Sequence, residues 1–337
     1  MKPANIDVAV LLIFFSRVEQ FEKVFEQVKK ARPSKLFLYQ DGARVGRQDD
    51  VEGIQRCRAI VEDIDWECEV YKFYQDKNLG CDPSEFIAQK WAFSIVDKCI
   101  VLEDDDVPSQ SFFPYCKELL DKYENDERIN MICGMNNIGI SENIDSSYLF
   151  TKKGSIWGWA SWSRVLNTWD EHYSWLDNEK ALEVMKKSFD SNREFEAYIK
   201  NVRKHKESGR AHYESILSAS CFLYNRLNIV PKHNMISNIG VGSETTHSVS
   251  DVKLLPKRIR KLLYMKTYEI DFPMNHPNYI VRDKEFEKAM TFTQLQSYLT
   301  KFESVLLRIR YGDFNSLKKG IKRRLFGKKH STDFRKF

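Results

Sequence analysis

The stretch Ile100-Val101-Leu102-Glu103-Asp104-Asp105-Asp106 decides the predicted fold, because a short apolar strand there ends in four consecutive acids. Neighbouring carboxylates repel one another unless they are solvated or share a hard divalent cation through oxygen ligands. A solvated turn that caps the next helix is the alternative, but one cap needs a single acid. The stretch therefore predicts a strand that leads into a metal-binding acidic turn, as is typical of phosphate chemistry.

Short apolar runs alternate with amphipathic stretches through the first 135 residues. Such alternation indicates βαβ units with a mostly parallel sheet. The expected strands cover 8–15, 36–40, 69–73 and 100–102, and the expected helices cover 18–30, 51–63 and 84–96. We therefore predict an α/β fold in which helices flank a Rossmann-like, mostly parallel sheet.

Four polar turns follow the expected strands. In open parallel sheets, ligands bind outside the carboxyl ends of the strands. This rule places the turns 15–17, 41–42, 77–80 and 103–106 along one edge of the sheet. We predict a binding crevice at that edge.

The second half of the chain differs from the first in being rich in tryptophan and in expected helices. Five tryptophans lie between residues 157 and 175, and helical stretches are expected near 178–187, 191–206 and 212–224. We expect residues 1–135 and 136–255 to form two halves of one domain. Residues 256–337 are expected to form a helical, basic C-terminal extension.

The basic charge is concentrated at the end of the chain. Residues 301–337 hold 12 Lys and Arg against 3 acids, a net charge of +9, which leaves 41 bases and 45 acids, or −4, for the rest. A mildly acidic body is a poor surface for nucleic acid. The basic, amphipathic segment 301–337 suggests contact with an anionic membrane surface, whereas a packed helix with a solvated basic face, or a disordered basic end, is the alternative.

The sequence also predicts where the protein works. The longest clean apolar run, 8–15, is far shorter than the roughly 20 residues of a membrane span, and Asp7 abuts it without a signal-peptide pattern. Seven scattered cysteines without a C-x-x-C pair indicate reduced, mostly buried thiols. We expect a cytoplasmic protein, with a possible peripheral position on the inner face of the cell membrane.

Taken with its neighbours, the acidic turn gives the chain a resemblance to a known family. The matching segments are 10–17, 38–44, 78–81, 102–105 with Phe112 and Phe113, 157–160, and 238–240 through 246–247. In this order they resemble bacterial glycosyltransferases of the glycosyltransferase-A fold, most closely family-two-like sugar transferases of surface polysaccharide pathways, some of which carry haemolytic-protein labels. The Glu-Asp-Asp triplet is also similar to that of eukaryotic N-acetylglucosaminyltransferases.

The resemblance implies nucleotide-sugar binding by residues 1–135 and acceptor binding with catalysis by residues 136–255. It implies an inverting, metal-dependent transfer of a sugar from a nucleotide diphosphate donor, with UDP-sugars favoured, to a glycan or lipid-linked glycan acceptor. By resemblance, Asp105 binds Mn²⁺ or Mg²⁺, Asp104 contacts ribose or metal-bound water, and His247 reaches the metal or the diphosphate. The expected donor-binding residues are Phe15, Arg17, Asp41, Lys77, Gly80 and Asp104.

Several of these residues have a second interpretation. Asp41 would accept the N–H of a base edge, or it simply starts an Asp-Gly turn. Arg17 and Lys77 would pair with the diphosphate or hold the acidic rim, although lone basic residues in loops are commonly just solvated. Asp106 is an extra acid to which the sequence assigns no role.

The acceptor side centres on the start of an expected helix. Glu214 is the candidate general base for the acceptor hydroxyl, with His212 as a second choice, whereas a favourable charge at a helix N-terminus is the alternative. Trp157 and Trp159 flank Gly158, which would let an indole approach a sugar ring. Core packing is the competing interpretation for these tryptophans.

Two other functions compete with sugar transfer. A sugar nucleotidyltransferase would use a similar sheet, but it normally has a Gly-rich phosphate loop after the first strand, and residues 15–18 contain no glycine. A catalytically silent nucleotide- or glycan-binding protein at the membrane surface is the other alternative. Turnover of a nucleotide sugar separates these functions.

Overall fold

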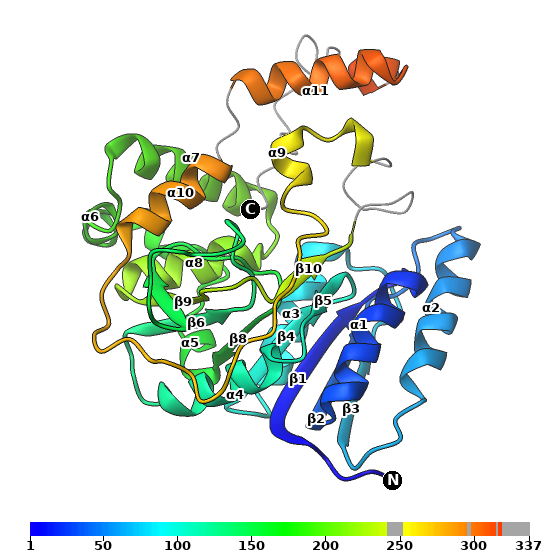
Figure 1. Ribbon diagram of the computed structural model, residues 1–337. Coiled ribbons are helices and arrows are strands. Elements are labelled where there is room, and N and C mark those ends of the chain that lie inside the picture. Colours follow the sequence, from blue (N-terminus) through cyan, green and yellow to red (C-terminus); the bar gives the residue numbers. More distant parts are fainter. Residues whose placement is uncertain (241–251, 295–297, 315, 319–337) are drawn as a thin grey trace.

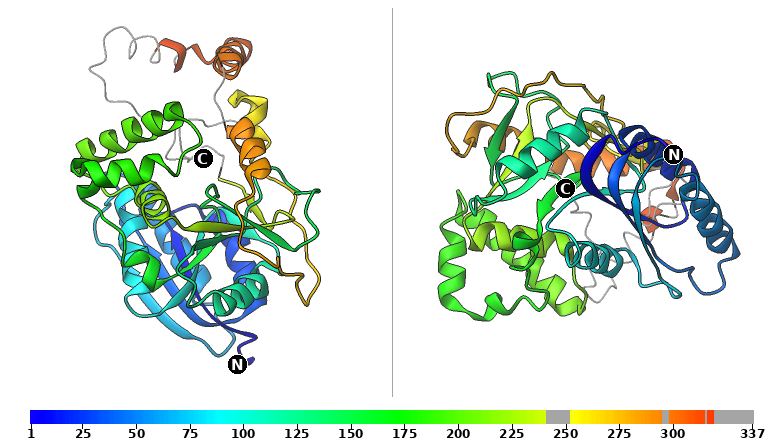
Figure 2. Two further views of the ribbon diagram at one scale, coloured as in Figure 1. Left: turned by 90° about the vertical axis from the view of Figure 1, so that its left-hand side faces the viewer. Right: turned by 90° about the horizontal axis from the view of Figure 1, so that it is seen from below.

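The protein is described here by a computed structural model, which places residues 1–240, 252–294, 298–314 and 316–318. Its central feature is an eight-stranded sheet in the order β3-β2-β1-β4-β8-β6-β9-β7, with helices packed against its two faces (Figures 1 and 2). Six of these strands run in one direction, while β7 and β8 run antiparallel to their neighbours. The chain therefore has a mixed α/β, Rossmann-like fold, as the sequence predicts.

The first four strands form the parallel part of the sheet. They are β1 (Ile6–Phe14), β2 (Pro33–Gln40), β3 (Glu69–Tyr74) and β4 (Lys98–Glu103), connected in part by α1 (Val18–Ala31), α2 (Gln48–Val61) and α3 (Cys81–Phe93). All seven of these elements are predicted from the sequence, with bounds that differ by at most a few residues. The reason is the clear periodicity, since the end of β1 is continuously buried and α1 buries one stripe.

The strands that follow β4 in the chain were missed in the sequence. They are β6 (Ile129–Cys133), β7 (Tyr148–Thr151), β8 (Trp159–Trp162) and β9 (Leu227–Pro231), and a separate two-stranded sheet pairs β5 (Asp106–Pro108) with β10 (Ile236–Asn238). Each is five residues or shorter, and β6, β7 and β8 are buried at every position. Short, fully buried strands show no polar–apolar alternation, which is why the pattern did not reveal them.

The helices of the second half agree better with expectation. Three of them, α6 (Glu179–Lys186), α7 (Asn192–Ser208) and α8 (Tyr213–Leu223), confirm the stretches predicted near 178–187, 191–206 and 212–224. The remaining elements are α4 (Phe112–Lys122), α5 (Ser163–Leu166), η1 (Ser174–Asp177), η2 (Val252–Leu254), α9 (Lys257–Arg260), α10 (Lys284–Gln294) and α11 (Tyr298–Arg310). In the part of the chain that the structure describes, no helix has the length and hydropathy to cross a membrane.

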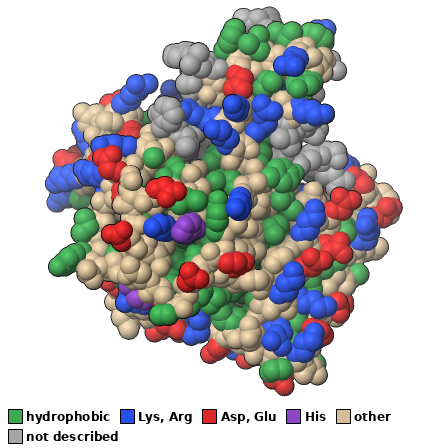
Figure 3. All heavy atoms as spheres, in the orientation of Figure 1, with side chains coloured by type: hydrophobic (Ala, Val, Ile, Leu, Met, Phe, Trp, Pro, Cys, Tyr) green, Lys and Arg blue, Asp and Glu red, His purple; other side chains and the backbone are tan. Residues whose placement is uncertain are grey.

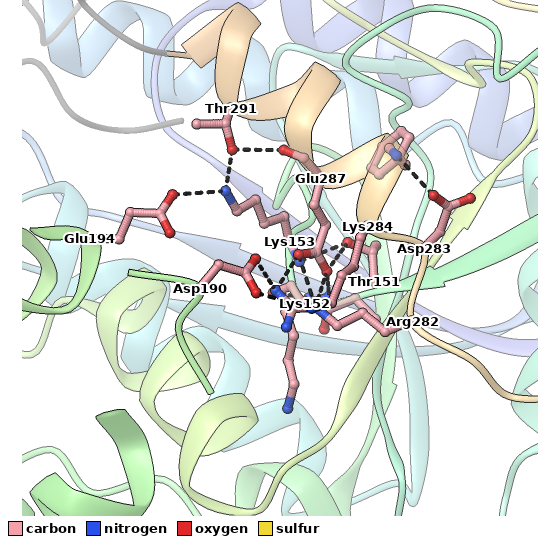
Figure 4. Close-up of polar contacts among 12 residues, drawn as sticks. Thr151, Lys152, Lys153, Asp190, Glu194, Arg282, Asp283, Lys284, Glu287 and Thr291 are labelled. Atoms are coloured by element: carbon pink, nitrogen blue, oxygen red, sulfur yellow. Dashed lines mark hydrogen bonds and ion pairs between the residues drawn. The ribbon is translucent and has the colours of Figure 1, made fainter. Parts of the chain in front are cut away.

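A buried ion pair fastens α10 to the sheet (Figure 4). Glu287, which is 2% exposed, accepts hydrogen bonds from the Thr151 hydroxyl at 3.1 Å and from the Lys152 backbone N–H at 2.6 Å. Its carboxylate also pairs with the Arg282 guanidinium, which donates in turn to Asp190 at 2.8 Å. These contacts join β7, α10 and the segment before α7 at one point.

We predict that Glu287→Ala lowers the free energy of unfolding by about 2–4 kcal/mol, because Arg282 and the Lys152 N–H lose a buried acceptor together. Urea denaturation followed by circular dichroism measures the loss. Glu285→Ala is the matched control on the same helix, where the exposed Glu285 pairs with Lys288, and it should change stability by no more than about 0.5 kcal/mol. Equal effects of the two substitutions would contradict this role of Glu287.

Candidate active site

The carboxyl ends of β1, β2 and β4 meet at one edge of the sheet. In the strand register, Ile13 lies beside Glu103 and Phe14 lies beside Gln40. The turns that follow these strands, including the acidic turn after Glu103, therefore start from the same edge. This confirms the predicted clustering of three of the polar turns.

Arg17 lies between the first two aspartates of the acidic turn. Its Nη2 donates to Asp104 Oδ1, and its Nη1 donates to Asp105 Oδ2 at 2.7 Å, while the Phe15 N–H donates to Asp104 Oδ2 at 3.2 Å. Burial disfavours the charged guanidinium, but the ion pairs with Asp104 and Asp105 outweigh burial and raise the pKa of Arg17 above its usual value. Of the roles that the sequence left open, the structure shows Arg17 holding the acidic rim.

Asp106 has a structural role that the sequence did not assign. Its carboxylate is fully buried and accepts the Gly158 N–H at 3.0 Å and one Asn238 side-chain N–H at 3.1 Å. The same Asn238 amide donates to Asp105 Oδ1 at 2.9 Å. Burial, with the neighbouring Asp105 adding to it, raises the pKa of Asp106 well above its usual value. Asp106 thus ties the acidic turn to the start of β8 and to β10.

The acidic turn fits a divalent cation in charge and in ligand type, with one condition. Asp104, Asp105 and Asp106 carry three formal negative charges, and Arg17 supplies one positive charge among them. Each carboxylate oxygen of the turn already accepts a hydrogen bond, so an ion at Asp105 has to replace or share the contact with Arg17. Gly240 packs so closely that a Cβ there would overlap Asp105 Oδ2. His247, the second predicted ligand, lies outside the described residues.

Asp41 anchors the loop that follows β3. Its carboxylate, on a residue only 6% exposed, accepts backbone N–H groups from Gly42, Leu79 and Gly80, each at 2.9 Å, and the Asn78 amide at 2.8 Å. Burial raises the pKa of Asp41, although these hydrogen bonds oppose the rise. The structure thus shows Asp41 organising a loop, as in the alternative interpretation, and contact with a base edge stays a prediction.

The rest of this loop depends on two glycines. A Cβ at Gly42 would lie 2.6 Å from the backbone N of Lys77, so only glycine lets the two turns pack together. Gly80 has φ +87° and precedes the first residue of α3. Lys77 itself is exposed at the rim.

A second polar cluster forms where two helices begin. The Asp82 carboxylate, in the first turn of α3, lies 3.2 Å from Nδ1 of His212, the residue that precedes α8. Glu214, in the first turn of α8, has a carboxylate oxygen within 4.8 Å of the nearest ligand atoms of Asp82 and His212. The sequence indicated Glu214 and His212 but missed Asp82, because the helix was expected to start at residue 84. An acid two residues before that start was the available signal.

This cluster is better suited to handle a proton than to hold a metal. The ligand types and spacing of the three residues would admit a cation. However, His212 has both ring nitrogens engaged, Nδ1 by Asp82 and Nε2 by the Ser208 hydroxyl at 3.0 Å. The N-termini of α3 and α8 also favour anions over cations. The start of α8 and the Asp82–His212 pair thus lie beside the Glu214 carboxylate.

Tyr213 connects the two polar clusters. The Tyr213 hydroxyl donates to Glu103 Oε1 at 3.2 Å, so the start of α8 is attached to the last residue of β4. The acidic turn follows directly after Glu103. The two parts of the candidate site are therefore neighbours in space although about 110 residues separate them in the sequence.

The two candidate acceptor-binding tryptophans take different positions. Trp159 is 1% exposed and lies between the rings of Phe93 and Tyr213, so it takes the core role that the sequence had left open. Trp157 is partly exposed and packs beside Leu255 and Leu263. Between the two tryptophans, Gly158 has φ +59°, and a Cβ there would overlap the Ile236 side chain. Trp157 alone of the pair can meet a ligand without repacking.

Known proteins show only distant structural similarity to this chain. No family model matches the chain, and no curated protein matches its sequence. Among solved structures, UDP-glucose pyrophosphorylase complexed with UDP-glucose is 7% identical over 68% of this chain and 91% of that chain, with a TM-score of 0.31. The glycosyltransferase GlyE of Streptococcus pneumoniae TIGR4 is 13% identical over 54% and 39%, with a TM-score of 0.28.

A third solved structure is similar to this chain at an equally low level. The inositol-1-phosphate CTP transferase of T. maritima is 10% identical over 51% of this chain and 77% of that chain, with a TM-score of 0.31. Similarities at this level carry no argument about what this chain binds or catalyses. The fold assignment above depends on the strand order and strand directions of the chain itself.

We predict that Arg17→Met lowers the free energy of unfolding by about 3–5 kcal/mol, because Asp104 and Asp105 lose their shared cation in a buried setting. Millimolar Mn²⁺ should recover part of the melting temperature, since a cation can then bind the freed carboxylates. Thermal denaturation with and without Mn²⁺ measures both effects.

The control for this experiment is Arg44→Met. Arg44 also pairs with a buried carboxylate, since it donates to Asp50 at 2.6 and 2.7 Å, and among the described residues none of its hydrogen bonds or ion pairs reaches the acidic turn. This variant should lose stability without responding to Mn²⁺. The assignment fails if Mn²⁺ shifts the melting temperatures of the two variants equally.

Proposed function

We propose that the protein is a glycosyltransferase, which moves a sugar from a nucleotide diphosphate donor to a glycan acceptor in bacterial surface polysaccharide synthesis, with inversion. One observation supports it above all. The acidic turn with Arg17 lies next to the Asp82–His212–Glu214 cluster through the Tyr213–Glu103 hydrogen bond. Groups for a diphosphate and a group for proton removal thus share one edge of the sheet.

On the donor side, the proposed roles follow from charge. Sugar transfer breaks the bond between the anomeric carbon and a phosphate oxygen, so negative charge grows on the leaving diphosphate and needs a cation. A Mn²⁺ or Mg²⁺ ion held by Asp105 and His247 would supply Lewis-acid stabilisation there. Arg17, once released from Asp105, is the adjacent cation that pairs with the diphosphate. Asp104 is left to orient the ribose of a donor, which we propose to be a UDP-sugar.

On the acceptor side, Glu214 removes the proton of the attacking hydroxyl. The bond from the acceptor oxygen to the anomeric carbon forms as the diphosphate departs, and the proton passes to the Glu214 carboxylate. Glu214 lies in the first turn of α8, and the Asp82–His212 pair lies beside its carboxylate. Trp157, which is partly exposed, is the proposed stacking surface for the acceptor sugar.

Two contacts bear on the alternative functions. A nucleotidyltransferase needs open backbone N–H groups after the first strand to hold phosphates. Here the Phe15 N–H already donates to Asp104. A silent binding protein would not need a carboxylate beside a His–Asp pair. Cytoplasmic location, with peripheral contact at the inner membrane face through residues 301–337, stays a prediction from the sequence.

The decisive experiment is turnover of nucleotide sugars by the full chain with Mn²⁺. Release of nucleoside diphosphate supports the proposal. Formation of nucleoside triphosphate from nucleotide sugar and pyrophosphate would identify a nucleotidyltransferase instead, and binding without any turnover would identify a silent binding protein.

We predict that Asp105→Asn abolishes metal-dependent turnover while the circular dichroism spectrum stays that of the folded protein. An amide is a weaker ligand for a hard cation than a carboxylate, but it fills the same space. Asp49→Asn, at an exposed aspartate in the first turn of α2, is the control and should keep full activity. Retained metal-dependent activity in Asp105→Asn would reject its metal role.

We predict that Glu214→Gln lowers turnover by at least about a hundredfold while donor affinity is unchanged, because the variant cannot take the proton. Glu207→Gln, at an exposed position near the end of α7, provides the matched substitution and should be neutral. Steady-state kinetics and donor titration measure the two quantities. If both variants keep normal turnover, another group acts as the base.

A further inference from the structure

The structure adds a second basic segment to the one found in the sequence. Residues 252–268 contain six Lys and Arg and no acid, and they form η2, α9 and the turns that follow. The basic residues are Lys253, Lys257, Arg258, Arg260, Lys261 and Lys266. All four of the lysines are exposed. This end of the molecule therefore carries a dense positive charge.

An exposed apolar stripe lies on α11. Phe302, Val305, Leu306 and Ile309 follow the i, i+3, i+4, i+7 spacing of one helix face, and they are 62%, 42%, 48% and 49% exposed. Globular proteins bury such a stripe, and a contiguous exposed one marks an interaction surface. In Figure 1, α11 stands apart from the sheet beyond α9, and Figure 3 shows hydrophobic side chains over the same end of the molecule.

The basic segment and the apolar stripe are joined. The Lys257 backbone N–H donates to Glu303 Oε1 at 3.0 Å, which connects the start of α9 to α11. In Figure 3, Lys and Arg side chains gather just below the hydrophobic group at this end. Apolar residues with cations beside them are the pattern of a surface that binds anionic lipid.

We propose that residues 252–268 and α11 form a membrane-docking face for an anionic lipid bilayer. The stripe of α11 enters the boundary between headgroups and acyl chains, while the lysines of α9 and its flanks contact the anionic headgroups. Charge complementarity favours an anionic lipid bilayer as the ligand of this face, since each Lys or Arg near such a surface raises the affinity about fivefold. A second copy of the chain would bring the same positive charge against it.

The docking face is attached directly to the candidate active site. The Tyr264 N–H donates to the Asn238 carbonyl at 2.9 Å, and Asn238 holds both Asp105 and Asp106. Leu255 and Leu263 pack beside Trp157. A docked protein would therefore hold the acidic turn close to the lipid surface, where a lipid-linked glycan is presented. Membrane binding itself does not depend on the transferase proposal.

The test is co-sedimentation of the full chain with vesicles of phosphatidylcholine alone or mixed with phosphatidylglycerol. We expect binding to the anionic vesicles only, and release by high salt. Lys257→Glu with Lys261→Glu should weaken binding at least about tenfold. Leu306→Asp with Ile309→Asp should weaken it by a similar factor, because the stripe can no longer enter the apolar layer.

Matched substitutions on α6 are the controls. Lys186→Glu with Lys187→Glu, the last residue of α6 and its C-cap, and Val184→Asp alter exposed residues of the same kinds and should bind like the unchanged protein, because α6 lies away from α9 and α11 (Figure 1). Equal binding to neutral and anionic vesicles, or no binding to either, would overturn the proposal. So would dimerisation in solution that the Leu306 and Ile309 substitutions abolish. Turnover with a soluble acceptor should stay normal in these variants, so that failure here is distinct from failure of the proposed function.

Discussion

The ion pairs of Arg17 with Asp104 and Asp105 are the constraint on which the candidate site depends. Three aspartates in sequence and mostly out of solvent would destabilise the edge of the sheet if all were charged and unpaired. Arg17 offsets one charge, and the Gly158 N–H and the Asn238 amide donate hydrogen bonds to the buried carboxylate of Asp106. In the proposed metal site, the negative charge that remains would attract a further cation, which would have to displace Arg17 from Asp105.

The fold was largely predictable because its first half follows the simplest rules. The run at 8–15 and the stripe of α1 fix a strand and a helix by periodicity, and βαβ order then fixes a parallel sheet. The insertion of β8 between β4 and β6 was not predictable in the same way. Its four residues include Trp159, which the sequence offered both as an acceptor contact and as a core residue, and only tertiary packing shows that Trp159 lies in the core.

The candidate site was predictable in composition but not in its contacts. The sequence identifies Arg17, the acidic turn and Glu214 as candidate site residues, because charged residues at strand ends and helix starts commonly contact ligands. The pairing of Arg17 with two aspartates depends on how strands β1 and β4 align. Asp82 escaped notice since its partner His212 lies 130 residues later, and sequence patterns report neighbours in the chain, not neighbours in space.

The hydrogen bonds of Asn238 restrict which residues can take its place in distant homologues. Its amide nitrogen serves Asp105 and Asp106 with separate hydrogens, and its oxygen accepts the Gly240 N–H at 3.1 Å. A carboxylate at this position would repel the pair, and glutamine is longer by one methylene. Homologues that keep the two aspartates should thus retain an asparagine at the end of a short strand and a glycine two residues later. This spacing of asparagine and glycine would identify homologues whose overall sequence identity to this chain is low.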